Sequence, residues 1–174
     1  ADFILTMDDK RNEFRNQDIR IANGEITEIG KNLLLADETR EINARGCVVT
    51  PGLVNTHHHL FQTLTKAVPE GQDALLFGWL KTLYPIWSKF GPEEIRVSAM
   101  TGLAELALSG CSLTSDHLYL YPNGSRLDDT IDAAKEIGIR FSPTRGSMSI
   151  GESDGGLPPD SLVEKENLIL EDCI

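Results

Sequence analysis

The chain has 174 residues, of which 40% are hydrophobic, and 16 Lys and Arg stand against 27 Asp and Glu, a formal net charge of −11. This composition predicts a soluble globular protein that acts on a small molecule. It argues against nucleic acid or an anionic membrane surface as a partner, because phosphate groups are bound by basic patches. No run approaches the roughly 18 apolar residues of a membrane span.

The three cysteines, Cys47, Cys111 and Cys173, are odd in number and widely spaced in apolar surroundings. They predict reduced, buried thiols in a cytoplasmic protein, not a disulfide framework. The chain begins without a methionine inside a strand-like segment and stops inside a helical pattern. We therefore expect an N-terminal fragment of a longer protein.

Residues 1–50 have the pattern of strands. Alternating segments occur at residues 3–6, 18–21 and 25–29. The dipeptide Asn23-Gly24 joins the last two, and Asn-Gly favours the type I′ turn of a hairpin because both central residues need positive φ. This half of the chain is thus expected to be all β.

Strands and helices alternate over residues 51–174. A short buried strand is expected at residues 52–56, ahead of a long aromatic-rich insertion that includes residues 75–90. The pattern then predicts a helix over 91–110, a strand over 111–117, a helix over 128–137, a strand over 138–145, and a helix from Asp160-Ser161, where Ser161 and Glu164 have capping-box spacing. About three βα units of this kind predict an α/β fold with a parallel sheet or barrel.

The side chains best suited to chemistry fall where these strands end. They are His57, His59, His117 and Arg145. In parallel α/β folds the binding and catalytic groups lie at the carboxyl ends of the strands. Asp116 is a poor candidate because its side chain should face the other side of its strand.

The segment Asn55-Thr-His-His-His-Leu-Phe-Gln62 holds three of the four histidines. Residues two apart on a strand share a face, so His57 and His59 are expected to face one centre while His58 faces away. Two neutral imidazoles suit zinc or another transition ion, with further ligands from elsewhere. A polar cluster that only caps the strand is the plain alternative.

The run Val48-Val-Thr-Pro-Gly-Leu-Val-Asn-Thr-His57-His-His59 resembles the first-strand signature of the amidohydrolase superfamily, Pro-Gly, two hydrophobic residues, Asp or Asn, any residue, and His-x-His. The resemblance implies a (β/α)8 TIM-type barrel. Residues 1–50 would form the N-terminal part of a small β-sandwich domain and residues 51–174 the first βα units of the barrel. It also implies one divalent metal, zinc or alternatively iron, held by His57 and His59.

Longer stretches are similar to a narrower branch, the bacterial 8-oxoguanine deaminases. They are residues 57–65, 79–87, 115–125 and 144–149. This likeness implies a deaminase that converts 8-oxoguanine to urate and ammonia. Isoxanthopterin, guanine or a hydroxytriazine are alternative substrates, and a non-catalytic remnant or binding module is the alternative from another class. A homo-oligomer is a further expectation.

Three further residues are candidates for substrate binding. Gln62 matches a glutamine that guanine-type deaminases use on the purine ring, and otherwise it is an ordinary polar residue at a helix start. His117 could line the pocket or hydrogen-bond a loop. Arg145 could bind a substrate carbonyl or form a buried ion pair. Trp79 and Trp87 fit core or lid packing better than stacking on a ring.

The resemblance also implies residues that this chain does not contain. The superfamily takes further histidines from the fifth and sixth strands and an aspartate from the eighth, and this branch adds a glutamate near the fifth. All four histidines of this chain occur by residue 117. The catalytic acid and base are therefore expected beyond Ile174, and the fragment alone is expected to be inactive.

Overall fold

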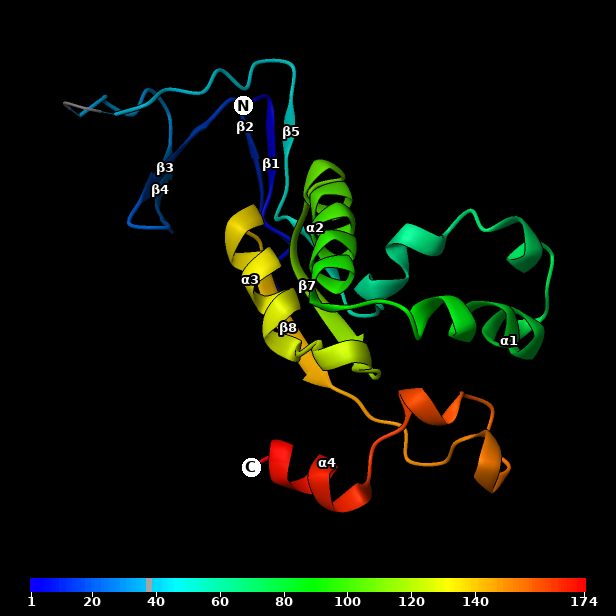
Figure 1. The fold of residues 1–174 in the computed structure, drawn as a ribbon. Helices are drawn as coiled ribbons and strands as arrows, with labels where there is room; N and C mark the ends of the chain where they lie inside the picture. The colour runs from blue at the N-terminus through cyan, green and yellow to red at the C-terminus, as the bar shows by residue number, and fades with distance from the viewer. Residues whose placement is uncertain (37–38) are drawn as a thin grey trace. The chain divides into compact units, whose positions relative to one another are not determined.

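The structure is a computed structural model that describes residues 1–36 and 39–174. The chain divides into two compact units, Ala1–Gly52 and Leu53–Ile174 (Figure 1). Within the described residues, no helix combines the length and apolar character needed to cross a membrane.

The first unit consists of short strands. Strand β1 (Phe3–Leu5) pairs antiparallel with β2 (Glu13–Arg15) and parallel with β5 (Val48–Val49). Strands β3 (Asp18–Ala22) and β4 (Glu25–Gly30) form the predicted hairpin, and Asn23 and Gly24 have φ of 53° and 79°. The sequence did not indicate β2 or β5, because two or three residues are too few to show alternation.

The second unit contains a parallel sheet in the order β6-β7-β8. Its strands are β6 (Leu53–Asn55), β7 (Cys111–Leu118) and β8 (Arg140–Arg145). Helix α2 (Pro92–Leu108) leads into β7 and α3 (Leu127–Ile137) into β8. The predicted βα alternation is confirmed. The expected burial of the first strand is wrong, since β6 is the sheet edge and Leu53 is 62% exposed.

Both long helices begin and end as their sequences indicate. In α2 the Glu94 carboxylate accepts the N–H of Gly91 at 2.8 Å, and in α3 the Asp129 carboxylate accepts the N–H of Arg126 at 2.7 Å. These bonds satisfy amides that have no partner inside the helix. Gly138 ends α3 in the left-handed conformation, with φ of 80°.

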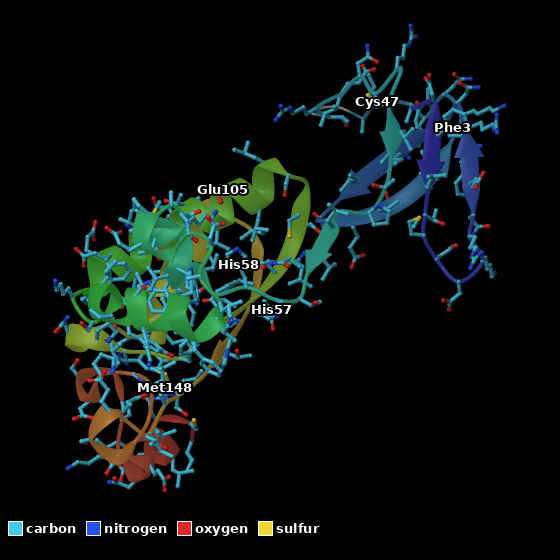
Figure 2. The ribbon with its side chains drawn as sticks, turned by 90° about the vertical axis from the view of Figure 1, so that its right-hand side faces the viewer. Phe3, Cys47, His57, His58, Glu105 and Met148 are labelled. Atoms are coloured by element: carbon cyan, nitrogen blue, oxygen red, sulfur yellow. The ribbon has the colours of Figure 1, made fainter. Side chains whose placement is uncertain are left out.

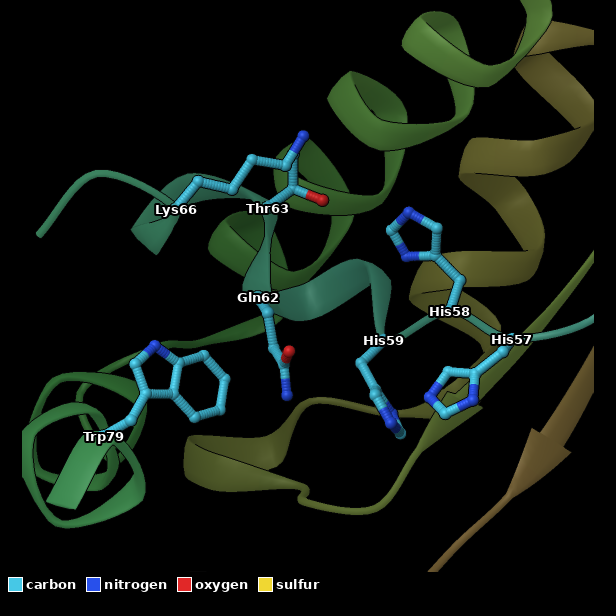
Figure 3. Close-up of a pocket in the computed structure, with 7 residues that line it drawn as sticks. All are labelled: His57, His58, His59, Gln62, Thr63, Lys66 and Trp79. Carbon is cyan, nitrogen blue, oxygen red and sulfur yellow. The ribbon is translucent and has the colours of Figure 1, made fainter. Parts of the chain in front are cut away.

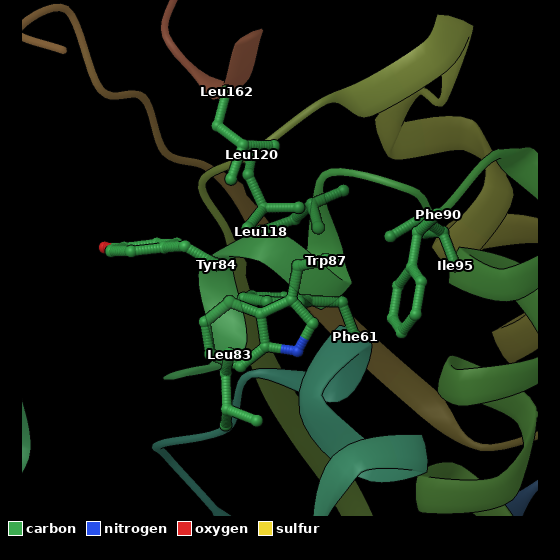
Figure 4. Close-up of a cluster of buried hydrophobic side chains, with 9 residues drawn as sticks. All are labelled: Phe61, Leu83, Tyr84, Trp87, Phe90, Ile95, Leu118, Leu120 and Leu162. Atoms are coloured by element: carbon green, nitrogen blue, oxygen red, sulfur yellow. The ribbon is translucent and has the colours of Figure 1, made fainter. Parts of the chain in front are cut away.

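Two apolar clusters hold the second unit together. Helices α2 and α3 contribute Ala99, Leu103, Ala133 and Ala134 to one of them, together with Leu60. The insertion ahead of α2 forms helix α1 (Leu76–Trp87), which is central to the other. That cluster, shown in Figure 4, consists of Phe61, Leu83, Tyr84, Trp87, Phe90, Ile95, Leu118, Leu120 and Leu162.

Short 3-10 turns connect these elements. They are η1 (Leu60–Thr65), η2 (Pro69–Gly71), η3 (Pro122–Gly124), η4 (Glu152–Asp154) and η5 (Asp160–Leu162). The last helix, α4, spans Glu166–Asp172, so the predicted helix start at residue 160 is wrong. The reason is that Glu164 does not cap a helix but forms two hydrogen bonds with the Arg145 guanidinium, of 3.0 and 2.6 Å.

All three cysteines are free thiols, but only one of them is buried. Cys111 is buried, whereas Cys47 and Cys173 are exposed, so the prediction of buried thiols is wrong for those two. Cys47 precedes β5, and its carbonyl oxygen accepts the N–H of Phe3 at 3.4 Å (Figure 2).

Candidate functional site

The histidine segment directly follows strand β6. The rings of His57 and His59 lie edge to face, with centroids 5.1 Å apart. Figure 3 shows that His58 points away from them. The structure thus brings His57 and His59 together, as the alternation of side chains predicts, although the regular strand ends at Asn55.

The end of β7 holds this segment in place. The N–H of His117 donates to the carbonyl of His58 at 2.9 Å, and the N–H of Leu60 donates to Oδ1 of Asp116 at 2.8 Å. Strands β6 and β7 are parallel neighbours, so their carboxyl ends meet. The turn that carries His59 is therefore fixed on both sides by the same strand.

One hydrogen bond also fixes the tautomer of His59. Its Nδ1 lies 2.8 Å from the carbonyl oxygen of His117. A carbonyl oxygen only accepts, so Nδ1 carries the proton and Nε2 keeps a lone pair. An imidazole oriented through its other nitrogen in this way is typical of metal ligands.

The donor set fits part of a transition-metal centre. His57 and His59 offer neutral nitrogen donors, which suit zinc and iron. Over residues 1–36 and 39–174, no three His, Cys, Asp or Glu side chains are grouped so that they could hold an ion. A complete centre needs further ligands besides this pair.

A cavity of about 450 Å³ opens beside the pair. Gln62 faces it from η1, and its Nε2 donates to the hydroxyl oxygen of Tyr119 at 3.2 Å. Burial raises the pKa of the Tyr119 phenol to about 12, so the hydroxyl stays neutral. The lining residues, shown in Figure 3, are His57, His58, His59, Gln62, Thr63, Lys66 and Trp79.

His117 lies next to the pair through both its backbone and its ring. The ring centroid is 5.5 Å from that of His59 and 5.6 Å from that of Tyr119. Burial, and then the neighbouring His59 and His57, lower the pKa of His117. The result is a neutral imidazole next to His59, although His117 is not among the residues that line the cavity.

Gly146 allows the chain to pass over the His117 ring. A Cβ at this position would lie 2.3 Å from Nε2 of His117 and 2.7 Å from Cβ of Tyr119. Side-chain carbons do not approach other atoms so closely. The absence of a side chain at Gly146 is therefore what lets both rings take their places.

Arg145 is occupied by acidic partners. Its guanidinium bonds the Glu164 carboxylate twice, the Asp172 carboxylate at 3.0 Å and the Gly146 carbonyl at 2.8 Å. It also lies over the Tyr121 ring, 4.6 Å from the centroid. Although desolvation acts to lower the pKa of Arg145, the bonds to Glu164 and Asp172 raise it overall. Arg145 is not among the residues that line the cavity.

Sequence reasoning missed two residues that position the site. As expected, the Asp116 side chain lies on the opposite side of β7 from a side chain that could bind the metal, and it is 1% exposed. Burial raises its pKa to about 6, and its Oδ2 has no hydrogen-bond partner among the residues that the structure describes. Tyr119 was also missed. No local pattern indicates either role, because each depends on contacts with residues 56 or 57 positions away.

Comparison with known proteins gives concordant results. A model of the Amidohydrolase family matches residues 48–171. The 8-oxoguanine deaminase of Pseudomonas aeruginosa is 49% identical over 136 residues, covering 76% of this chain and 30% of that protein. An isoxanthopterin deaminase from an unidentified prokaryote is 42% identical over 136 residues, covering 76% of this chain and 28% of that protein.

The fold also resembles that of a related solved structure. The crystal structure of a mutant atrazine chlorohydrolase from Arthrobacter aurescens, complexed with zinc and atraton, is 30% identical with a TM-score of 0.79, covering 99% of this chain and 40% of that one. This likeness confirms the predicted fold class, an α/β protein with a partial TIM-type barrel. The chain spans 30% or less of the length of these two deaminases.

Proposed function

Because this chain belongs to the amidohydrolase family, we propose that the protein carrying it is a metal-dependent hydrolytic deaminase that converts 8-oxoguanine to urate and ammonia. The observation that carries the proposal is the oriented pair of imidazoles at the end of β6. The 49% identity to an 8-oxoguanine deaminase supports the choice of substrate.

His57 and His59 would hold one divalent ion, zinc or alternatively iron. When bound in such a site, the ion supplies Lewis-acid activation of water. The chain's own contribution is orientation. The His117 carbonyl keeps the proton of His59 on Nδ1, and the Asp116 carboxylate fixes the turn through the Leu60 amide.

Gln62 would bind the purine ring. Its carboxamide offers donors and an acceptor, which suit the amide edge of an oxidised purine. His117, a neutral ring next to His59, and Arg145 remain the other predicted substrate-binding residues. A substrate carbonyl would have to compete with Glu164 for the Arg145 guanidinium, so of the two residues we favour His117 for substrate binding.

The proton-transfer groups would come from other parts of the protein. No Asp or Glu is among the residues that line the cavity. We propose that residues 1–50 belong to a small β-sandwich domain and that residues 51–174 supply the first βα units of the barrel. The acid and base would then lie on strands outside these 174 residues.

Isoxanthopterin is the second candidate substrate. The isoxanthopterin deaminase shares 42% identity with this chain, and its substrate is named as a pterin. Both ring systems carry the amide edge that Gln62 suits, so the residues described here favour neither. The net charge of −11 disfavours nucleic acid as a partner, which agrees with a small purine or pterin substrate. We expect the protein to act in the cytoplasm.

The test is ammonia release by the protein expressed from its whole reading frame with zinc. 8-Oxoguanine, guanine and isoxanthopterin are supplied separately. The proposal expects the highest kcat/KM with 8-oxoguanine. Release from isoxanthopterin alone would transfer the same chemistry to a pterin, and release from none of the three would overturn the assignment as a deaminase of these rings.

A further inference from the structure

Tyr119 connects the two halves of the candidate site. It follows the last residue of β7, and its hydroxyl oxygen accepts the Nε2–H of Gln62 at 3.2 Å. Its ring lies edge to face with the rings of His59 and Phe61, with centroids 5.2 Å away in each case. One side chain thus touches both His59 of the histidine pair and the Gln62 carboxamide.

We propose that Tyr119 is a positioning residue that holds the Gln62 carboxamide in place at the cavity, where it can pair with adjacent N–H and C=O groups of a substrate ring. The proposal rests on the function proposed above and deepens it. Tyr119 acts through Gln62 and does not touch the reacting atoms.

The chemistry of the carboxamide supports this role. A glutamine side chain has two N–H hydrogens and one acceptor oxygen. With one N–H donated to the Tyr119 hydroxyl, a single N–H and Oε1 remain for a ring. An N–H next to a C=O, as in 8-oxoguanine, is complementary to that pair.

The hydroxyl anchors the carboxamide without choosing between its two ends. A phenol both donates and accepts, so it can bond either the Nε2–H or Oε1 of Gln62. Its contribution is therefore to substrate affinity, through a carboxamide that is held at the cavity.

The first test is Tyr119→Phe in the whole protein, which removes the hydroxyl and keeps the ring against His59. We expect KM for 8-oxoguanine to rise about fivefold to tenfold, the range for loss of one hydrogen bond, with kcat and zinc content unchanged. Tyr84→Phe is the matched control. It removes another hydroxyl of the same apolar cluster, which bonds Sδ of Met148 at 3.6 Å.

A double-mutant cycle separates positioning from general packing. In a Gln62→Ala background, Tyr119→Phe should cause no further change in KM, since the group it positions is gone. The same rise in both backgrounds, or loss of zinc in Tyr119→Phe alone, would show that Tyr119 acts on the structure and would overturn the inference.

Binding of xanthine tests the inference without turnover. Xanthine has adjacent N–H and C=O groups and is not a deamination substrate. Tyr119→Phe should weaken its binding about fivefold to tenfold, and should weaken it no further in the Gln62→Ala background. Equal binding of xanthine by wild type and Tyr119→Phe contradicts the inference. Absence of ammonia release despite this pattern of xanthine binding contradicts only the proposed function.

Discussion

Adjacent histidines have different surroundings in this protein. His59 is tied through Nδ1 to the carbonyl of His117 and faces His57. His58 points the other way, and its buried Nδ1 has no hydrogen-bond partner within residues 1–36 and 39–174. Burial, followed by the nearby Lys66, lowers the pKa of His58. Its environment suits a neutral ring that is not directed at an ion.

We predict that His59→Ala and His58→Ala differ sharply in metal affinity. Loss of a ligand should exceed the tenfold to roughly hundredfold effect typical of residues that only orient ligands. His59→Ala should therefore bind zinc more than about 100-fold more weakly, while His58→Ala binds it as wild type does. Competition with a zinc chelator measures both. Equal losses would show that the alternation of side chains does not define the ligand pair.

Asp116 predicts a pH dependence of stability. Its folded pKa of about 6 lies above the ordinary value of 3.8 for an aspartate, so the folded protein holds the proton more tightly than the unfolded chain. This contribution is complete below pH 3.8 and is lost as the pH rises through about 6. Its size is on the order of 2–3 kcal/mol.

The Asp116→Asn variant isolates this effect. Its amide oxygen can still accept the Leu60 N–H but does not titrate in this range. Urea unfolding at pH 4 to 7 should give a wild-type free energy that falls relative to that of the variant as the pH rises. Parallel profiles for the two proteins would refute the raised pKa.

At the scale of elements, the carboxyl end of β7 organises the site. Asp116, His117 and Tyr119 contact Leu60, His59 and Gln62 in turn. The sequence predicts β7 and its neighbours because apolar periodicity and glycine stops are local signals. It does not predict these contacts, which depend on how two parallel strands and the turn after one of them lie against each other.

Gly146→Ala tests how closely the chain that follows β8 must approach His117 and Tyr119. The added Cβ would collide with His117 and Tyr119, so we expect destabilisation on the order of 1–3 kcal/mol and weaker metal binding. Gly78→Ala in α1 is the matched control. Its nearest contact would be 3.8 Å away, and alanine in a helix should stabilise by about 0.5–1 kcal/mol. A neutral Gly146→Ala in urea unfolding would contradict the geometry.

Arg145 links the end of β8 to the segment that includes α4. Its side chain is 11% exposed and Glu164 is 24% exposed, so Arg145→Met leaves a carboxylate poorly compensated and should cost roughly 3–5 kcal/mol. Amide exchange should rise over residues 146–174. Arg126→Met, which breaks an exposed pair with Asp128, should change stability by no more than about 1 kcal/mol. Equal effects would mean that Arg145 is not structural.

Over the whole molecule, the sequence predicts the class of the fold and the histidine pair, but not the residues that hold the pair in place. Pro51-Gly52 and His-x-His are local signals, and the alternation of βα units follows from short-range periodicity. The start of α4 was mispredicted because Glu164 bonds a residue 19 positions earlier. Long-range polar contacts of this kind leave no pattern in one sequence.

We propose that His57 and His59 form part of a metal centre in a deaminase. The most direct test is the crystal structure of the whole protein with zinc, measured by anomalous scattering at the zinc edge. We expect one ion about 2.0–2.1 Å from Nε2 of His59 and from a ring nitrogen of His57. An ion bound elsewhere, or through Nδ1 of His59, would contradict it.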